Sequence, residues 1–289
     1  MVDYLRGNAT ANATGLFVIC KHLARHPNGC AEEDLRRSLR LLRSDEDQDS
    51  ILDASLEVGE NIGLLERRAN ASALAVDPNV GASLEKATDH WPVFRGELLY
   101  KINEHALDSL SAKEKLPDLV GGLAIFVQSD PLSPLTEAWG EGSEDYFLKK
   151  VGSTYVARSE QWRPFMRWAL SLGLARLAGS TKPGVIIPDA STAIADQLHA
   201  LPASGTASEW LSALRDRLPV LGSATFTAEL PEDRVWSEVP PAVVLGLLKL
   251  ERSDHLKLEP ADDASDVISI GLGADSRQIG RIEVMSRHA

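Results

Sequence analysis

The chain has 289 residues and a formal net charge of −12, because 42 Asp and Glu outnumber 30 Lys and Arg. Its hydrophobic share of 44 % is ordinary for a globular protein, which excludes wholesale disorder and a collagen-like structure. No apolar run approaches the roughly 20 residues of a membrane span, and the first residues lack the apolar core of a signal peptide. We therefore expect a soluble, cytoplasmic protein that contacts no membrane.

The acidic charge is unevenly distributed along the chain. Residues 158–230 hold 7 basic against 6 acidic residues, whereas the segments on either side are net acidic. Cations that replace counterions supply much of the affinity for a phosphate backbone, so a DNA-facing surface is expected within 158–230. The candidate DNA-binding residues there are Arg158, Arg163, Arg167, Arg176 and Lys182.

The N-terminal segment predicts three helices followed by a hairpin. Apolar residues recur at helical spacing from 16 to 23, with Thr14 as the expected N-cap, and the turn at 27–29 ends this helix. Two further helices and two strands are predicted within 31–42, 50–62, 63–67 and 73–76. This order of elements resembles the winged helix-turn-helix superfamily, which predicts a winged-helix domain over 1–80.

The third helix of that domain begins with an acidic run. A winged helix places its third helix in the major groove, where like charge opposes phosphate. The run therefore leaves three readings open: a solvated capping face, a docking surface for a basic protein partner, or a groove-reading helix. Its candidate partner-binding residues are Asp45, Glu46, Asp47 and Asp49. Arg67 and Arg68, at the wing, are candidate phosphate contacts or ordinary surface arginines.

The rest of the chain predicts three more segments. Residues 81–157 form a helical connecting region, in which the apolar run 121–127 is either a buried strand or a helix. Residues 158–230 form a helix-rich α+β domain, with the tryptophans of its first helix in the core and an alternating strand at 224–230. Residues 231–289 form a helix and a hairpin that ends in an alternating strand at 278–285. The predicted fold class is helix-rich α+β, built of tandem winged-helix-like modules with small β-hairpins.

The sequence contains no motif of a known catalytic site. A phosphate-binding GxxxxGK[ST] loop, a GxSxG nucleophile elbow and an HExxH metal motif are all missing. We therefore expect a protein that is not an enzyme and holds no cofactor.

A group of two cysteines and two histidines invites a zinc reading: Cys20, His22, His26 and Cys30. On a helix, however, positions 20 and 22 point about 200° apart, so all four cannot converge while it stays helical. We expect no metal site, and read His22 and His26 as a surface pair one helical turn apart.

The most distinctive segment is Trp-Arg-Pro-Phe-x-Arg-Trp-Ala-Leu-x-Leu-Gly-Leu at 162–174, followed by Pro188-Asp189. Together with a winged-helix start and a winged-helix-like end, this layout resembles the DpdG proteins of bacterial Dpd systems. Those systems are tied to 7-deazaguanine modification of DNA and to phage restriction. The resemblance implies a non-catalytic component whose enzymes are partner proteins.

Two functions follow from these observations. The first is a DNA-associated component of a DNA-modification and anti-phage defence assembly, which contacts double-stranded DNA weakly through 158–182 and the wing. The second is a protein–protein adaptor that uses winged-helix domains to bind basic partner subunits and never touches DNA.

Overall fold

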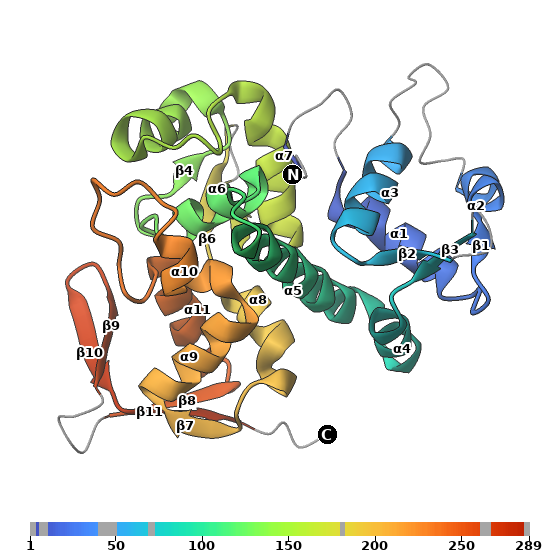
Figure 1. Cartoon of the computed structure of the whole chain (residues 1–289). Coiled ribbons are helices and arrows are strands. Elements are labelled where there is room, and N and C mark those ends of the chain that lie inside the picture. The colour runs from blue at the N-terminus through green and yellow to red at the C-terminus, as the bar shows by residue number, and fades with distance from the viewer. Residues whose placement is uncertain are drawn as a thin grey trace. The chain divides into compact units, whose positions relative to one another are not determined.

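The computed structural model describes residues 4–5, 11–39, 51–68, 73–179, 183–260 and 267–285. It is a helix-rich α+β fold with small antiparallel sheets, which confirms the predicted fold class at this level (Figure 1). The chain divides into two compact units. Unit 1 holds residues 1–119 and 160–172, and unit 2 holds residues 120–159 and 173–289. The four-segment division expected from the sequence stays a prediction.

The N-terminal module of unit 1 runs from α1 to β3. Its elements are α1 (Ala13–Leu23), β1 (Cys30–Ala31), α2 (Glu32–Ser38), α3 (Ile51–Asn61), β2 (Leu65–Arg67) and β3 (Ala73–Val76). The strands form one antiparallel sheet in the order β1-β3-β2. The N-cap of α1 is Asn12 rather than Thr14, because the Asn12 side chain accepts a hydrogen bond from the amide of Gly15 at 2.8 Å.

Apolar burial holds this module together. The predicted stripe of α1, which includes Leu16 and Ile19, is buried and packs against α3 and β3. The sheet brings β2 close to α3, where a Cβ built on Gly59 would lie only 2.7 Å from Cδ1 of Leu65. A larger residue at position 59 would therefore force the Leu65 side chain to shift.

Further helices complete unit 1. They are α4 (Pro78–Lys86), α5 (His90–Ser111), the first residues of α6 (Asp118–Val127) and nearly all of α7 (Ser159–Ser171). The ring of Phe17 in α1 packs on those of Trp91 and Phe94 in α5, with centroids 5.3 and 5.2 Å away. The Asp118 carboxylate accepts hydrogen bonds from the amides of Tyr4 and Leu5. No helix within the described ranges is both long and apolar enough to cross a lipid bilayer.

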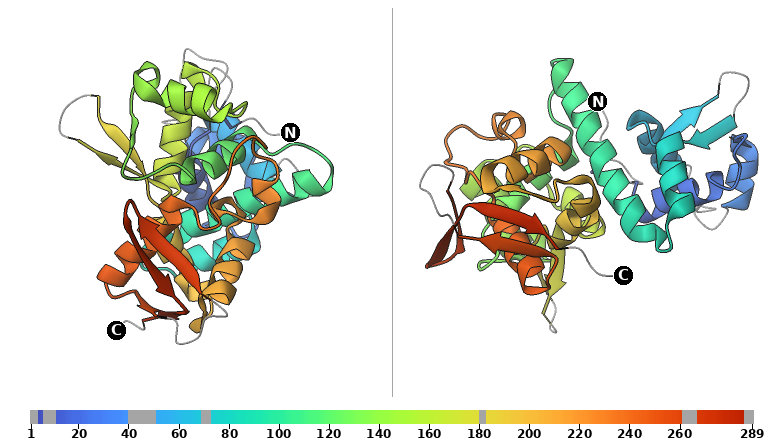
Figure 2. Two further views of the ribbon diagram at one scale, coloured as in Figure 1. Left: turned by 90° about the vertical axis from the view of Figure 1, so that its left-hand side faces the viewer. Right: turned by 90° about the horizontal axis from the view of Figure 1, so that it is seen from below.

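Unit 2 combines short strands with helices around a second core. Its strands are β4 (Leu135–Thr136), β5 (Ala175–Ala178), β6 (Val185–Pro188), β7 (Ser204–Thr206), β8 (Leu256–Glu259), β9 (Ile268–Leu272), β10 (Asp275–Ile279) and β11 (Arg281–Val284). Its main helices are the rest of α6, α8 (Ser191–Gln197), α9 (Ala207–Arg217), α10 (Ala224–Thr227) and α11 (Pro241–Arg252). The sheets run β4-β6-β5 and β7-β11-β8, and the hairpin β9–β10 lies against α11 through β9 (Figure 2).

In unit 2 the structure settles one assignment that the sequence left open and differs from the sequence prediction at two expected strands. Residues 121–127 are helical, as part of α6. Residues 224–227 form helix α10 instead of a strand, because the Ser223 side chain caps its N-terminus by accepting from the amide of Phe226. The strand expected at 278–285 is interrupted at Gly280, so that β10 pairs with β9 while β11 pairs with β7 and β8.

Candidate nucleic-acid interface

One face of helix α7 is aromatic and buried. Trp162, Phe165 and Trp168 are each at most 1 % exposed, which confirms the prediction that these tryptophans belong to the core. Trp162 and Phe165 stack with ring centroids 5.5 Å apart, and Trp168 meets the ring of Tyr4 edge to face. These large rings fix the rotation of α7 about its own axis.

The opposite face of α7 carries two exposed arginines. Arg163 and Arg167 are one helical turn apart and both point to solvent. Because the aromatic face anchors the helix, the two guanidinium groups leave it on a defined side. Of the candidate DNA-binding cations that the structure describes within 158–182, these two belong to unit 1.

The other candidate cations of 158–182 lie elsewhere. Arg158 and Arg176 are exposed and belong to unit 2, Arg158 just before α7 and Arg176 on β5. Nε of Arg176 is 3.8 Å from Oδ2 of Asp189, so part of its charge is balanced. Lys182 lies outside the described residues.

Acidic side chains surround Arg67, at the end of β2. Arg67 donates two hydrogen bonds to Glu60 of α3, at 2.8 and 2.6 Å, and one to Glu32 of α2 at 2.8 Å. These bonds to Glu60 and Glu32 raise the pKa of the Arg67 guanidinium above its ordinary value. The guanidinium therefore joins β2 to two helices, and a phosphate would have to compete with these carboxylates.

Further arginines of the N-terminal module are also paired. Arg36 bonds to Glu32 and Asp53, and Arg37 bonds to Asp34. Arg68 donates to the carbonyl oxygen of Pro27 at 2.9 Å. The acidic candidates Asp45, Glu46, Asp47 and Asp49 lie outside the described residues.

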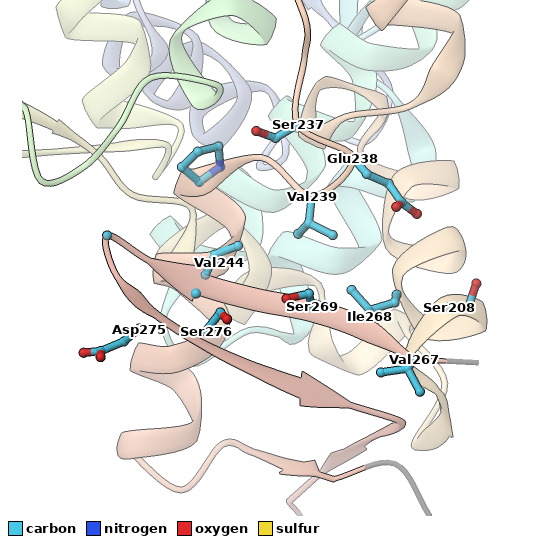
Figure 3. A pocket seen from close by; sticks show the side chains of 13 residues that line it. Ser208, Ser237, Glu238, Val239, Val244, Val267, Ile268, Ser269, Asp275 and Ser276 are labelled. Carbon is cyan, nitrogen blue, oxygen red and sulfur yellow. The ribbon is translucent and has the colours of Figure 1, made fainter. Parts of the chain in front are cut away.

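A hollow of about 590 Å³ opens in unit 2 between α11, the segment before it and the hairpin β9–β10 (Figure 3). Serine, valine and glycine dominate its lining, with two carboxylates, Glu238 and Asp275. Figure 3 shows these two at different sides of the hollow, pointing away from each other. Paired acid–base chemistry needs carboxylates that face a common substrate, which this arrangement does not provide.

Residues 6–264 match the family model described as DpdG-like. The chain belongs to the DpdG-like family. This confirms the family resemblance seen in the sequence, and it supports a role as a component of a Dpd-type DNA-modification system. No curated protein and no solved structure matches the chain.

This DpdG-like chain holds a buried polar cluster that sequence reasoning missed. Asp189, 3 % exposed, follows β6, and its carboxylate accepts from Nζ of Lys249 at 2.5 Å and from the amide of Ser191 at 2.9 Å. Nζ of Lys249 also donates to Oγ of Ser191 at 3.1 Å. Burial alone would raise the pKa of Asp189, but the bonds from Lys249 and Ser191 outweigh it and lower the pKa. The sequence feature that could have indicated this cluster is the charged Lys249 within the otherwise apolar run 241–250.

Three of the four side chains that were considered and rejected as zinc ligands from the sequence come together in unit 1. The ligand atoms of His22, His26 and Cys30 all lie within 4.8 Å of one another. Cys20 does not join them, since it is fully buried in the stripe of α1. Three potential ligands therefore converge where the sequence predicted only a histidine pair.

Proposed function

We propose that this DpdG-like chain is a non-catalytic, DNA-associated component of a Dpd-type system, with α7 contacting the phosphate backbone of duplex DNA. The observation that carries the proposal is the exposed pair Arg163 and Arg167, held in place by the buried tryptophans behind it. Arginine pairs to phosphate through two parallel donors, so two arginines one turn apart suit neighbouring phosphates. Arg158, Arg176 and Lys182 are further candidate contacts.

The N-terminal module fits the same proposal as a winged-helix domain. The element order from α1 to β3 and the antiparallel sheet β1-β3-β2 support this assignment. Its hairpin strands β2 and β3 would then form the wing, with Arg67 at the end of β2 and Arg68 directly after it.

A non-catalytic role draws support from the state of the one serine–lysine pair described above. A lysine can activate a serine only as a neutral amine. Nζ of Lys249 donates to Oδ2 of Asp189 at 2.5 Å and to Oγ of Ser191 at 3.1 Å, so it acts as a hydrogen-bond donor towards both side chains. Ser191 therefore has no base in Lys249, and the cluster acts as a structural clamp between α11 and the start of α8.

One observation favours the adaptor as a second candidate. In the N-terminal module Arg36 and Arg67 are engaged by Glu32, Asp53 and Glu60, which leaves more acidic than basic charge in that network. A surface of this kind would attract a basic protein partner and repel phosphate. In that case the module docks onto another subunit.

The test is binding of fluorescently labelled duplex and single-stranded DNA, measured by anisotropy across a salt series. We expect duplex affinity that falls with salt, and for R163E/R167E a slope shallower by about 2, since each lost phosphate contact removes roughly 0.9 from it. K149E/K150E changes the same charge on exposed lysines of unit 2 and is the matched control. No binding at low salt, or equal loss in both double variants, would overturn the assignment of α7 and favour the adaptor.

A further inference from the structure

His22, His26 and Cys30 meet at the C-terminal end of α1. His22 lies in the last turn of the helix, His26 in the turn that follows, and Cys30 in β1. The rings of His22 and His26 have centroids 4.8 Å apart. These three side chains line a hollow of about 410 Å³ together with Asp34 and Arg37 of α2.

The backbone around the cluster is held by its own hydrogen bonds. The amide of His26 donates to the carbonyl of Leu23, and the amide of Gly29 donates to that of His26, both at 2.8 Å. Gly29 has φ +86°, a left-handed conformation that glycine adopts readily, and it turns the chain into β1. Cys30 then pairs with Leu74 in the sheet, which fixes where its thiol emerges.

Buried polar atoms normally have a hydrogen-bond partner, and one ring nitrogen of His22 is an exception within the described part of the chain. Nε2 of His22 is buried and has no hydrogen-bond partner among the described residues. Such an atom destabilises the folded chain unless a ligand or water satisfies it. The neutral imidazole nitrogen is also the commonest protein ligand of transition metals. An unsatisfied imidazole nitrogen next to two further potential ligands is therefore the arrangement expected of a metal-binding site.

We propose that His22, His26 and Cys30 bind a divalent transition-metal ion of the zinc class. Imidazole and thiolate are the ligands that zinc prefers, with Zn–N about 2.0–2.1 Å and Zn–S about 2.3 Å. Tetrahedral bonds of that length place ligand atoms about 3.5 Å apart. The separation of up to 4.8 Å thus closes by a rotation of side chains, and His26 is exposed and free of the core.

The fourth position is assigned to water. Asp34 lines the same hollow, but Nη1 of Arg37 holds its carboxylate at 3.0 Å. Metal binding converts the Cys30 thiol to the thiolate, and the proton goes to solvent. Burial and, after it, the charge of Asp34 raise the pKa of the free Cys30 thiol, so the stabilisation of the thiolate has to come from the metal ion. The ion would fasten the end of α1 to the sheet.

The geometry departs from the sequence expectation for a simple reason. The sequence predicted no metal site because a site of all four residues would require Cys20 and His22 to converge from one helix, which helical geometry forbids. The three residues that do converge need no contribution from Cys20, because the turn after α1 brings Cys30 back to the helix end.

The test uses the full chain, stripped of metal with a chelator and titrated with Co²⁺. We expect one equivalent to bind, with intense visible bands of a tetrahedral site and a thiolate-to-cobalt charge-transfer band in the near ultraviolet. Zn²⁺ should displace Co²⁺ and bleach both. C30S should lose the charge-transfer band, whereas C20S, which alters the other buried cysteine, should keep it.

A second variant guards against misfolding. H26Q changes an exposed side chain, so its circular dichroism should match the wild type while its Zn²⁺ affinity falls at least about 100-fold, since even outer-shell changes weaken metal sites by up to that factor. H199Q, on another exposed histidine, should leave affinity unchanged. Failure to bind one equivalent, or equal Zn²⁺ affinity in H26Q and the wild type, would overturn the site.

Discussion

Nζ of Lys249 lies 2.5 Å from Oδ2 of Asp189, a residue 60 positions earlier in the chain. The contact joins α11 to the connection between β6 and α8 in unit 2. It is reinforced by a hydrogen bond from the amide of Ala190 to the carbonyl of Ala242, at 3.1 Å. One ion pair and one backbone bond thus fix the same two segments to each other.

The substitution Lys249→Met should destabilise unit 2 through the aspartate that it leaves behind. Asp189 would stay buried with only the more distant Arg176, at 3.8 Å, to balance its charge, and we expect a loss of about 1–3 kcal/mol, less than for a fully buried pair because Lys249 is partly exposed. Urea unfolding followed by circular dichroism measures it. The double variant D189N/K249M should lose less unfolding free energy than D189N and K249M lose together. Strictly additive losses would contradict the pairing.

Acid should remove the stabilisation that Asp189 provides. Its pKa is lowered in the folded chain, so the ionised form favours folding, and this contribution is complete above the unfolded value of about 3.9. As the pH falls through the lowered folded pKa, the contribution disappears. The gap in unfolding free energy between the wild type and D189N should therefore be constant from pH 7 to about pH 5 and shrink towards pH 3. A gap that stays constant down to pH 3 would contradict the lowered pKa.

Arg67 should matter more for the stability of the N-terminal module than for DNA affinity. R67A removes three hydrogen bonds to Glu60 and Glu32 and leaves both acids without that partner. Since the network is partly exposed, we expect a loss of about 1 kcal/mol, visible as a lower Tm. R68A removes one bond to the Pro27 carbonyl and is the control. A larger Tm loss for R68A than for R67A would show that the network contributes little.

Periodicity and turn residues predicted the helices and strands whose sequence features lie within a few residues of one another. The stripe of α1 and the hairpin β2–β3 follow from periodicity and turn residues, and both are present. Alternation failed at 224–227, where the Ser223 cap favours a helix, and across Gly280, where one alternating run serves two sheets.

The sites were harder to foresee because their parts come from distant segments. The sequence around Asp189 does not predict its contact with Lys249. The helical spacing of His22 and His26 does not predict that Cys30 lies close to them. The pairing of Arg67 with Glu32 depends on the packing of α2 beside β2. Such contacts are set by tertiary structure, so composition and periodicity cannot predict them.

The edge-to-face contact of Tyr4 with Trp168 joins two residues of one compact unit that lie 164 positions apart in the chain. During synthesis on a ribosome, unit 1 cannot close its core until α7 has emerged, and by then residues 120–159 of unit 2 have already left the tunnel. At about 5–20 residues per second this leaves the tryptophan pocket open for several seconds at least. A nascent chain that stops before α7 would expose that pocket to chaperones and proteases.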